Sequence, residues 1–354
     1  MPDNAKMSVQ DAMNVYSNFA YYDGMQYKLD KSSHFKTYEE VEREFLLGVE
    51  IAKSDLYLAE IVGKLSFATV EQILYELKLL QTNKAYEDVL LTQAKTPYVR
   101  QGMKRLCNNG LARDLTYKSK KGINMHVFCL SDTGMQLIKK VLYSKLKNED
   151  TMLAIEPVEE AFRRLSSNYC AQVLKQRYGI SISYGKKVYT RSCGKNYIYG
   201  KHEYEKNEQR TVILVEPIYF NANKKLIPAG RLVEHNIEHL EFLDSYIEKL
   251  RTEDASVRIK IIFVAEDKVS TLKAVKIALE NLRFLKDSLP NDIKYAIENN
   301  QSYTLTKDQS TELQNICVTT EPLLYNTEKG EEFLGISKVI DGKASFMANY
   351  NILD

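Results

Sequence analysis

The chain has 354 residues, a net charge of +2 and a composition ordinary for a globular protein, so there is room for two domains and a sizeable core. No apolar run approaches the ~18 residues that indicate a membrane-spanning helix, and residues 1–15 lack the apolar core of a signal peptide. Five scattered cysteines, none at C-x-x-C spacing, argue against zinc ribbons and redox pairs and favour a reducing cytoplasm.

Residues 1–34 form a polar arm rich in Asp, Asn, Ser and Tyr. We expect the arm to pack on its own domain, with packing on a partner as the alternative. Thr37 and Glu40 have the spacing of a capping box at the start of the next helix. Asp55–Gly63 and Thr69–Leu80 follow as two helices joined by a short turn, as in a helix-turn-helix unit.

The next predicted helix starts at Thr96-Pro97, with a hydroxyl cap followed by proline at the first helical position. It runs to about Asn109, and Gly110 is a good C-terminal stop. An apolar face is formed at helical spacing by Val99, Met103 and Leu106. The other faces carry side chains that can reach base edges and phosphates in a major groove, namely Tyr98, Arg100, Gln101, Lys104, Arg105 and Asn108.

A hairpin is predicted after this helix, from the strands Leu111–Tyr117 and Ile123–Leu130. The turn between them is basic, and Lys118, Lys120 and Lys121 are expected on DNA backbone or in the minor groove. Ser131–Lys147 is predicted as a closing amphipathic helix. Residues 35–148 thus have the pattern of a winged helix-turn-helix, with the hairpin as the wing.

The charge distribution favours the same interpretation. Residues 95–147 carry a net charge of +10, whereas residues 1–94 carry −6. A nearly neutral protein has therefore concentrated positive charge in one segment, as a phosphate-contacting surface requires. The alternative is a solvated helix and hairpin in some other α/β protein.

Residues 149–354 are predicted to form an α/β domain, because strands and helices alternate. A helix is expected from Glu156-Pro157 to about Tyr178, with Arg163 and Arg164 on a solvated face. Further helices are predicted at Leu232–Leu250 and Val269–Leu285. The predicted strands are Ile180–Tyr184, Lys186–Arg191, Asn196–Tyr199, Thr211–Val215, Val257–Ala265 and Ile316–Thr319.

The order of these parts resembles the replication-relaxation family of plasmid and conjugative-element proteins. The resemblance lies in Leu65-Ser-Phe-Ala-Thr-Val-Glu-Gln72, in Val99–Leu111, in Phe128-Cys-Leu-Ser-Asp-Thr-Gly134, and in Val257–Val264 followed by a helix and Cys317-Val-Thr-Thr-Glu321. It covers about residues 50–320. It implies a DNA-binding protein of a mobile element, acting in replication, mobilisation or conjugation, or in control of transcription.

The resemblance also implies a restriction-endonuclease-like fold for the C-terminal domain. A working site of that type needs one acid at a strand end and an acid-x-lysine on the next strand, to hold a divalent metal and activate water. Here Tyr197-Ile-Tyr-Gly200 stands in the first place and Glu216-Pro-Ile218 in the second, so one acid and the lysine are missing. We therefore expect a structural or protein-binding domain with no catalytic residue.

Two further patterns have a chemical and a structural interpretation. His235-Asn-Ile-Glu-His239 matches H-x-x-E-H, the inverted zinc-peptidase motif, but no third ligand is nominated and acids surround the histidines, which favours a solvated helix face. Glu266-Asp267 follows a strong strand, where functional acids can lie, yet the pair suits a helix cap equally. No phosphate-binding loop is present. We expect no metal and no cofactor.

The sequence predicts a cytoplasmic, sequence-specific binder of double-stranded DNA, not an enzyme, with a homodimer and a replication or transfer protein as further partners. Two alternatives stay open. One is a metal-dependent nuclease that uses the C-terminal domain. The other is a protein–protein interaction module whose winged helix does not bind DNA.

Overall fold

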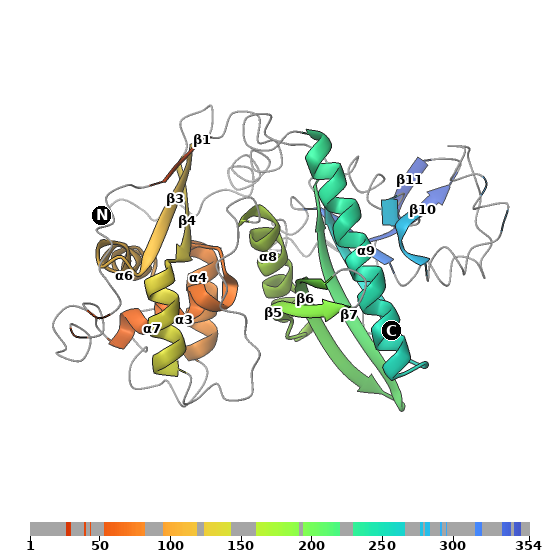
Figure 1. Cartoon of the computed structure of the whole chain (residues 1–354), viewed down its shortest axis with the longest axis horizontal. Coiled ribbons are helices and arrows are strands. Elements are labelled where there is room, and N and C mark those ends of the chain that lie inside the picture. Colours follow the sequence, from red (N-terminus) through yellow and green to blue (C-terminus); the bar gives the residue numbers. More distant parts are fainter. Residues whose placement is uncertain are drawn as a thin grey trace. The chain divides into compact units, whose positions relative to one another are not determined.

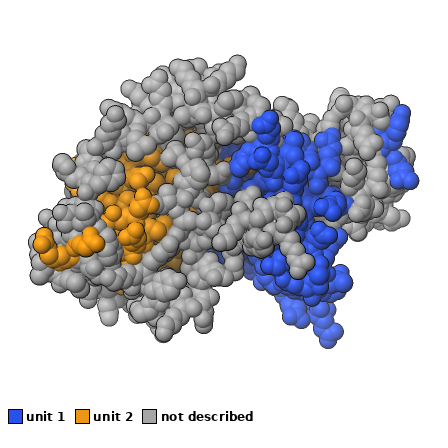
Figure 2. Space-filling view, in the orientation of Figure 1, with its two compact units in different colours: residues 1–23, 173–354 blue, residues 24–172 orange. Residues whose placement is uncertain are grey.

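The computed structural model describes residues 26–29, 39, 43, 53–81, 95–118, 124–142, 161–190, 194–219, 229–265, 277–278, 280–283, 291, 295, 316–320, 335–340 and 343–347. These residues form helices and two β-sheets, so the prediction of a mixed α/β protein is confirmed (Figure 1). The chain divides into two compact units (Figure 2). Unit 2 is residues 24–172, and unit 1 is residues 1–23 and 173–354.

Unit 2 combines helices with a small sheet in which every strand pair is antiparallel. Its helices are α3 (Lys53–Leu65), α4 (Val70–Gln81), α6 (Thr96–Asn108) and α7 (Asp132–Leu142). Its strands are β1 (Gln26–Leu29), β2 (Ala68–Thr69), β3 (Ala112–Lys118) and β4 (Asn124–Leu130), in the sheet order β1-β3-β4-β2. The helices predicted at 55–63, 69–80 and 96–109 are confirmed, and α7 confirms the first part of the helix predicted at 131–147. The helix predicted to begin at Thr37 lies mostly outside the described residues.

Strand β1 lies inside the predicted polar arm and pairs with β3, from Gln26 opposite Lys118 to Leu29 opposite Leu115. This part of the arm therefore packs on its own domain, as expected. The predicted capping box of Thr37 and Glu40 lies outside the described residues. A capping box that the sequence analysis did not identify begins α4, because the Thr69 and Gln72 side chains each accept a hydrogen bond from the other's backbone N–H.

The core of unit 2 is made by apolar side chains of its helices and of strands β3 and β4. Each residue of this core is at most 1% exposed, and the set includes Leu58, Val62, Ile73, Leu77, Val99, Met103, Leu106, Leu115 and Val127. Full burial of such a side chain contributes about 1.5–3 kcal/mol. The residues Val99, Met103 and Leu106 confirm the predicted apolar face of α6, and that face fixes the helix on the rest of the unit.

The first part of helix α8 (Ala161–Tyr178) belongs to unit 2 and is joined to it by buried amide side chains. Asn168 Nδ2 donates to the carbonyl oxygens of both Leu65 and Phe67 at 2.9 Å, and these flank the turn between α3 and β2. Gln72 Nε2 donates to the Leu165 carbonyl at 2.8 Å, and Gln172 Nε2 donates to the Gln72 carbonyl at 3.1 Å. Buried amide side chains of α8 and α4 therefore link the two helices and the turn between α3 and β2 through hydrogen bonds to backbone carbonyls.

The prediction that Arg163 and Arg164 form a solvated face is wrong, since they are only 2% and 1% exposed. The units divide between Gln172 and Val173, inside α8. The boundary expected near residues 148–149 lies outside the described residues and stays a prediction.

Unit 1 is organised by a seven-stranded mixed sheet in the order β11-β10-β9-β8-β7-β6-β5. The central strands β7, β8 and β9 are parallel, and the other pairs are antiparallel. Helix α9 (Ala229–Glu253) connects β7 to β8. The strands are β5 (Ser183–Thr190), β6 (Gly194–Lys206), β7 (Gln209–Ile218), β8 (Arg258–Ala265), β9 (Ile316–Thr320), β10 (Gly335–Ile340) and β11 (Lys343–Met347).

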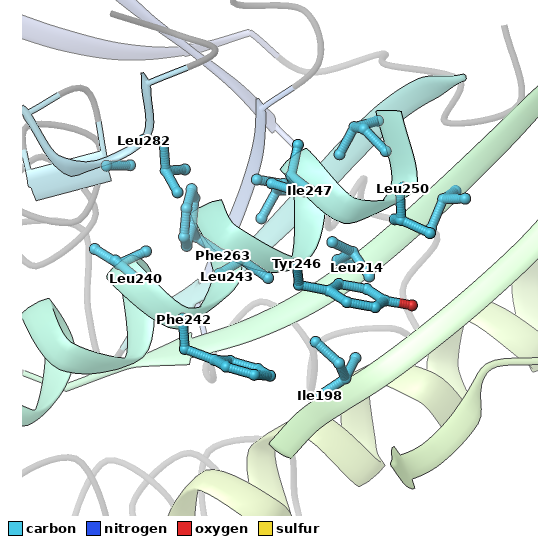
Figure 3. Close-up of a cluster of buried hydrophobic side chains, with 14 of the residues drawn as sticks. Ile198, Leu214, Leu240, Phe242, Leu243, Tyr246, Ile247, Leu250, Phe263 and Leu282 are labelled. Atoms are coloured by element: carbon cyan, nitrogen blue, oxygen red, sulfur yellow. The ribbon is translucent and has the colours of Figure 1, made fainter. Parts of the chain in front are cut away.

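Helix α9 covers the sheet of unit 1 through one apolar cluster (Figure 3). Leu240, Leu243 and Ile247 of α9 meet Leu214 of β7 and Phe263 of β8. The strands predicted at 211–215, 257–265 and 316–319 and the helix at 232–250 are confirmed, because each lies in β7, β8, β9 or α9 with small differences at the ends.

Elsewhere in unit 1 the strands differ from those that the sequence predicts. Three short strands were expected between residues 180 and 199, but the chain forms two long ones, β5 and β6, and strands β10 and β11 were not predicted. Of the helix expected at Val269–Leu285, Ala278 and Leu282 are buried in the α9 cluster. In the part of the chain described here, no helix is both long enough and apolar enough to cross a membrane.

Candidate nucleic-acid interface

Helix α6 begins and ends at sharp signals in the sequence. Lys95 is the N-cap and makes no side-chain capping bond, so the hydroxyl cap expected from Thr96 is wrong by one position. At the other end Gly110 has φ +70°, a left-handed conformation that favours glycine. The N–H of Leu111 donates to the Leu106 carbonyl, and the N–H of Gly110 donates to the Cys107 carbonyl. This is a Schellman motif, and it confirms Gly110 as the C-terminal stop.

The two faces of α6 differ completely in burial. Val99, Gly102, Met103 and Leu106 are buried. The exposed residues of the helix are Pro97, Arg100, Gln101, Lys104, Arg105 and Asn108. No residue of the helix is acidic. The exposed face therefore offers cationic and amide side chains that no carboxylate on the same helix neutralises.

One cation of this face is already engaged within unit 2. Arg105 Nε and Nη2 donate to Oδ2 and Oδ1 of Asp55, each at 2.7 Å. Asp55 lies at the start of α3 and its side chain is 1% exposed, whereas that of Arg105 is 43% exposed. Hydrogen bonding to Asp55 raises the pKa of Arg105 above its already high ordinary value, so the guanidinium stays charged. Arg105 thus ties α6 to α3.

Two neighbours of this ion pair bring α6 close to α3. A Cβ atom on Gly102 would lie 2.3 Å from Leu58 Cδ1 and 3.2 Å from Asp55 Oδ1, so only glycine fits there without displacement. Tyr98 is half-buried, and burial raises the pKa of its phenol, whose oxygen is buried. The Tyr98 hydroxyl, predicted to contact DNA, therefore lies within unit 2.

The predicted wing is an antiparallel hairpin of β3 and β4, which pair from Ala112 opposite Leu130 to Lys118 opposite Asn124. Lys118 is the last residue of β3. Lys120 and Lys121 lie outside the described residues, so their contacts with DNA stay predictions.

A tight joint connects the end of α6 to the start of α7. Ser131 Oγ donates to the Gly110 carbonyl and accepts from the Gly134 N–H at 3.0 Å, which makes Ser131 the cap of α7. A Cβ atom on Gly134 would lie 1.9 Å from the Leu111 carbonyl oxygen. The Ser-Asp-Thr-Gly segment therefore fixes the hairpin and α7 to the C-terminal end of α6.

Glu216 and His239, an acid and one of the two histidines singled out in the C-terminal domain, meet inside unit 1. His239 Nδ1 lies 2.9 Å from Glu216 Oε1, and both side chains are at most 3% exposed. The His239 ring also stands 4.8 Å from the Tyr199 ring, between centroids. The prediction that these histidines lie on a solvated helix face is therefore wrong for His239. Among the described residues, no three His, Cys, Asp or Glu side chains come together as a metal site.

Comparison of the chain with protein-family models, with curated proteins and with solved structures finds no match.

Proposed function

We propose that unit 2 is a winged helix-turn-helix that binds double-stranded DNA, with α6 as its recognition helix. The observation that carries the proposal is the composition of the exposed face of α6, where Arg100, Gln101, Lys104 and Asn108 face solvent opposite a fully buried apolar face. Cationic and amide side chains are the groups that contact phosphates and base edges in the major groove.

The order and pairing of the elements support the proposal. Helix α3, strand β2, helices α4 and α6 and the hairpin β3–β4 follow one another along the chain. Strands β3 and β4 form the hairpin that follows the recognition helix, with β2 paired to β4 and β1 paired to β3. This arrangement is typical of winged helices, in which the helix after the turn enters the major groove.

Charge supports the same conclusion. The segment 95–147, which holds α6, the hairpin and α7, has a net charge of +10 in a chain whose total is +2. Attraction to phosphates supplies most of the affinity in non-specific DNA binding and makes it depend on salt. We propose further that the protein binds as a homodimer on two half-sites, and, from its resemblance to replication-relaxation proteins, that these sites lie on a plasmid or other mobile element.

Fluorescence anisotropy with labelled duplexes from the protein's genetic neighbourhood, at several salt concentrations, tests the proposal. We expect tight, salt-dependent binding to one fragment. The double variant Arg100→Ala, Lys104→Ala should bind more weakly and with a shallower salt slope, by about one per lost phosphate contact. The matched control is Lys249→Ala, Arg251→Ala, which removes two exposed cations from α9 and should bind as the unmodified protein does.

Two results would count against the proposal. Equal loss of affinity in both double variants would mean that total charge, and not α6, determines binding. The second result has two parts: the unmodified protein does not bind any duplex above the non-specific level, and the double variant Lys120→Glu, Lys121→Glu keeps the activity of the protein in the cell. Together they would favour an interaction module that binds protein instead of DNA.

A further inference from the structure

We propose that Gln101 reads an A·T base pair in the major groove while Arg100 contacts a phosphate beside it. The inference rests on the proposed function of unit 2 and assigns separate roles within that interface. It follows from where the exposed side chains lie around and along α6, and from the pairing of Arg105 with Asp55.

The exposed residues of α6 divide into a centre and two flanks. At about 100° per residue, Gln101, Lys104 and Asn108 lie within about 30° of the direction opposite the buried side chains. Arg100 and Arg105 lie about 70° to either side of that direction. In a helix inserted into a groove, the centre meets the base edges and the flanks meet the sugar–phosphate walls.

The position along the helix separates the two central amides. Gln101 lies in the N-terminal half of α6, whereas Asn108 is its last residue and is followed by the Schellman turn at Gly110. Recognition helices of this class direct their N-terminal residues at base edges, and the positive end of the helix dipole favours the approach of phosphates. Gln101 is therefore the central amide that reaches the bases. A glutamine amide can pair with adenine N6 and N7 at once, which selects an A·T pair.

The two flanking arginines are not equivalent. Two donors of Arg105 are bound to the buried Asp55 carboxylate, so this flank presents an internally compensated ion pair. Arg100 lies on the opposite flank and is exposed. Arg100 is therefore the flanking arginine that contacts the DNA backbone. Arg105 is a positioning residue that holds α6 on α3.

These roles are tested by selecting bound duplexes from a random-sequence DNA library and sequencing them. The selection is made with the unmodified full chain, with Gln101→Ala and with Arg100→Ala. The unmodified protein should enrich a motif that contains a required A·T pair. Gln101→Ala should lose the preference at that one position, by about 5- to 150-fold, and keep its salt slope. Arg100→Ala should keep the motif, bind all duplexes more weakly and have a salt slope smaller by about one. Both side chains are exposed, and thermal melts should show both variants folded.

The outcomes separate this inference from the proposed function. Retention of every base preference in Gln101→Ala, or loss of one in Arg100→Ala, would overturn the assignment while leaving DNA binding in place. If the unmodified protein bound duplex DNA but enriched no motif, the assignment would also be overturned while DNA binding stayed in place. Absence of binding to any duplex would remove the proposed function and the inference with it.

Discussion

Arg105 and Asp55, fifty residues apart in the sequence, form a two-point ion pair in which only the arginine is partly exposed. The carboxylate is buried and depends on the guanidinium for compensation, whereas the guanidinium can turn toward water if the carboxylate is removed. The pair therefore predicts an asymmetry between its two truncations.

Arg105→Ala should lower the free energy of unfolding by about 2 kcal/mol or more, because it leaves Asp55 buried and unpaired. Asp55→Asn should cost less, about 1 kcal/mol, since it removes the buried charge and leaves Arg105 able to reach solvent. Urea denaturation measures both. Lys104→Ala, at an exposed position beside Arg105, is the matched control and should change stability little. Equal stability of Arg105→Ala and Lys104→Ala would contradict the structural role.

The glycines of unit 2 provide a second test. Gly134→Ala would place Cβ 1.9 Å from the Leu111 carbonyl oxygen, an atom that cannot move without shifting the α6–β3 connection. Gly102→Ala meets the end of the Leu58 side chain at 2.3 Å, which can rotate away. We therefore expect Gly134→Ala to destabilise by about 2–3 kcal/mol and Gly102→Ala by less.

Thermal melts followed by circular dichroism compare these glycine variants. Gly179→Ala serves as the reference, since it adds Cβ at φ +69° with no atom within 4 Å and measures backbone strain alone. If Gly134→Ala melted at or above the temperature of Gly179→Ala, the close approach to Leu111 would not be real.

Local sequence signals predicted α6 well, and the contacts that decide its chemistry are non-local. Thr96-Pro97, the spacing of Val99, Met103 and Leu106, and Gly110 all act within a few residues, so the helix could be recognised without the fold. Nothing near Arg105 indicates that its partner is Asp55. Gln101 and Arg105 therefore look equally available in the sequence, although two donors of Arg105 are bound to a buried carboxylate.

In unit 1, too, the sequence does not reveal the non-local contacts that bury a side chain. His239 stands among acidic residues on α9, a pattern that predicts solvent, yet the sheet beneath the helix supplies Glu216 and Tyr199 and buries the ring. Only short strands were predicted at 196–199 and 211–215, whereas β6 and β7 form a long hairpin whose turn, Asn207-Glu208, has no glycine to signal it. The burial of Arg163 and Arg164 likewise depends on tertiary packing that no periodicity reveals.

That turn leads to a prediction of increased stability. Asn207 and Glu208 both have positive φ, +53° and +62°, the conformation of a two-residue turn that prefers Asn-Gly. Glu208→Gly should raise the free energy of unfolding by about 0.5–1 kcal/mol, because the left-handed conformation is unfavourable for a residue with Cβ. The midpoint of urea denaturation measures the gain. Glu208→Ala removes the same charge but keeps Cβ, so a similar gain in that variant would attribute the effect to charge.

The amide of Asn168 is expected to be essential to unit 2. Asn168→Asp keeps the shape of the side chain but removes the two donors that bind the Leu65 and Phe67 carbonyls and places a charge in a fully buried position. We expect a loss of about 3 kcal/mol or more of unfolding free energy. Hydrogen exchange should show faster exchange of the amides in α3 and α4. Gln176→Ala, at an exposed position of the same helix, should leave both measurements unchanged.

Cys129, on β4 of the hairpin, should be unreactive in the native protein. Burial raises the pKa of its thiol to about 12. At pH 8 roughly one thiol in ten thousand is then ionised, compared with about a quarter for an unperturbed cysteine, and the thiolate is the species that reacts. Alkylation with iodoacetamide, followed residue by residue with mass spectrometry, should label Cys129 at least about 100-fold more slowly in the native protein than in urea. Labelling at equal rates in the two conditions would mean that the thiol faces solvent and that β4 is not packed as described.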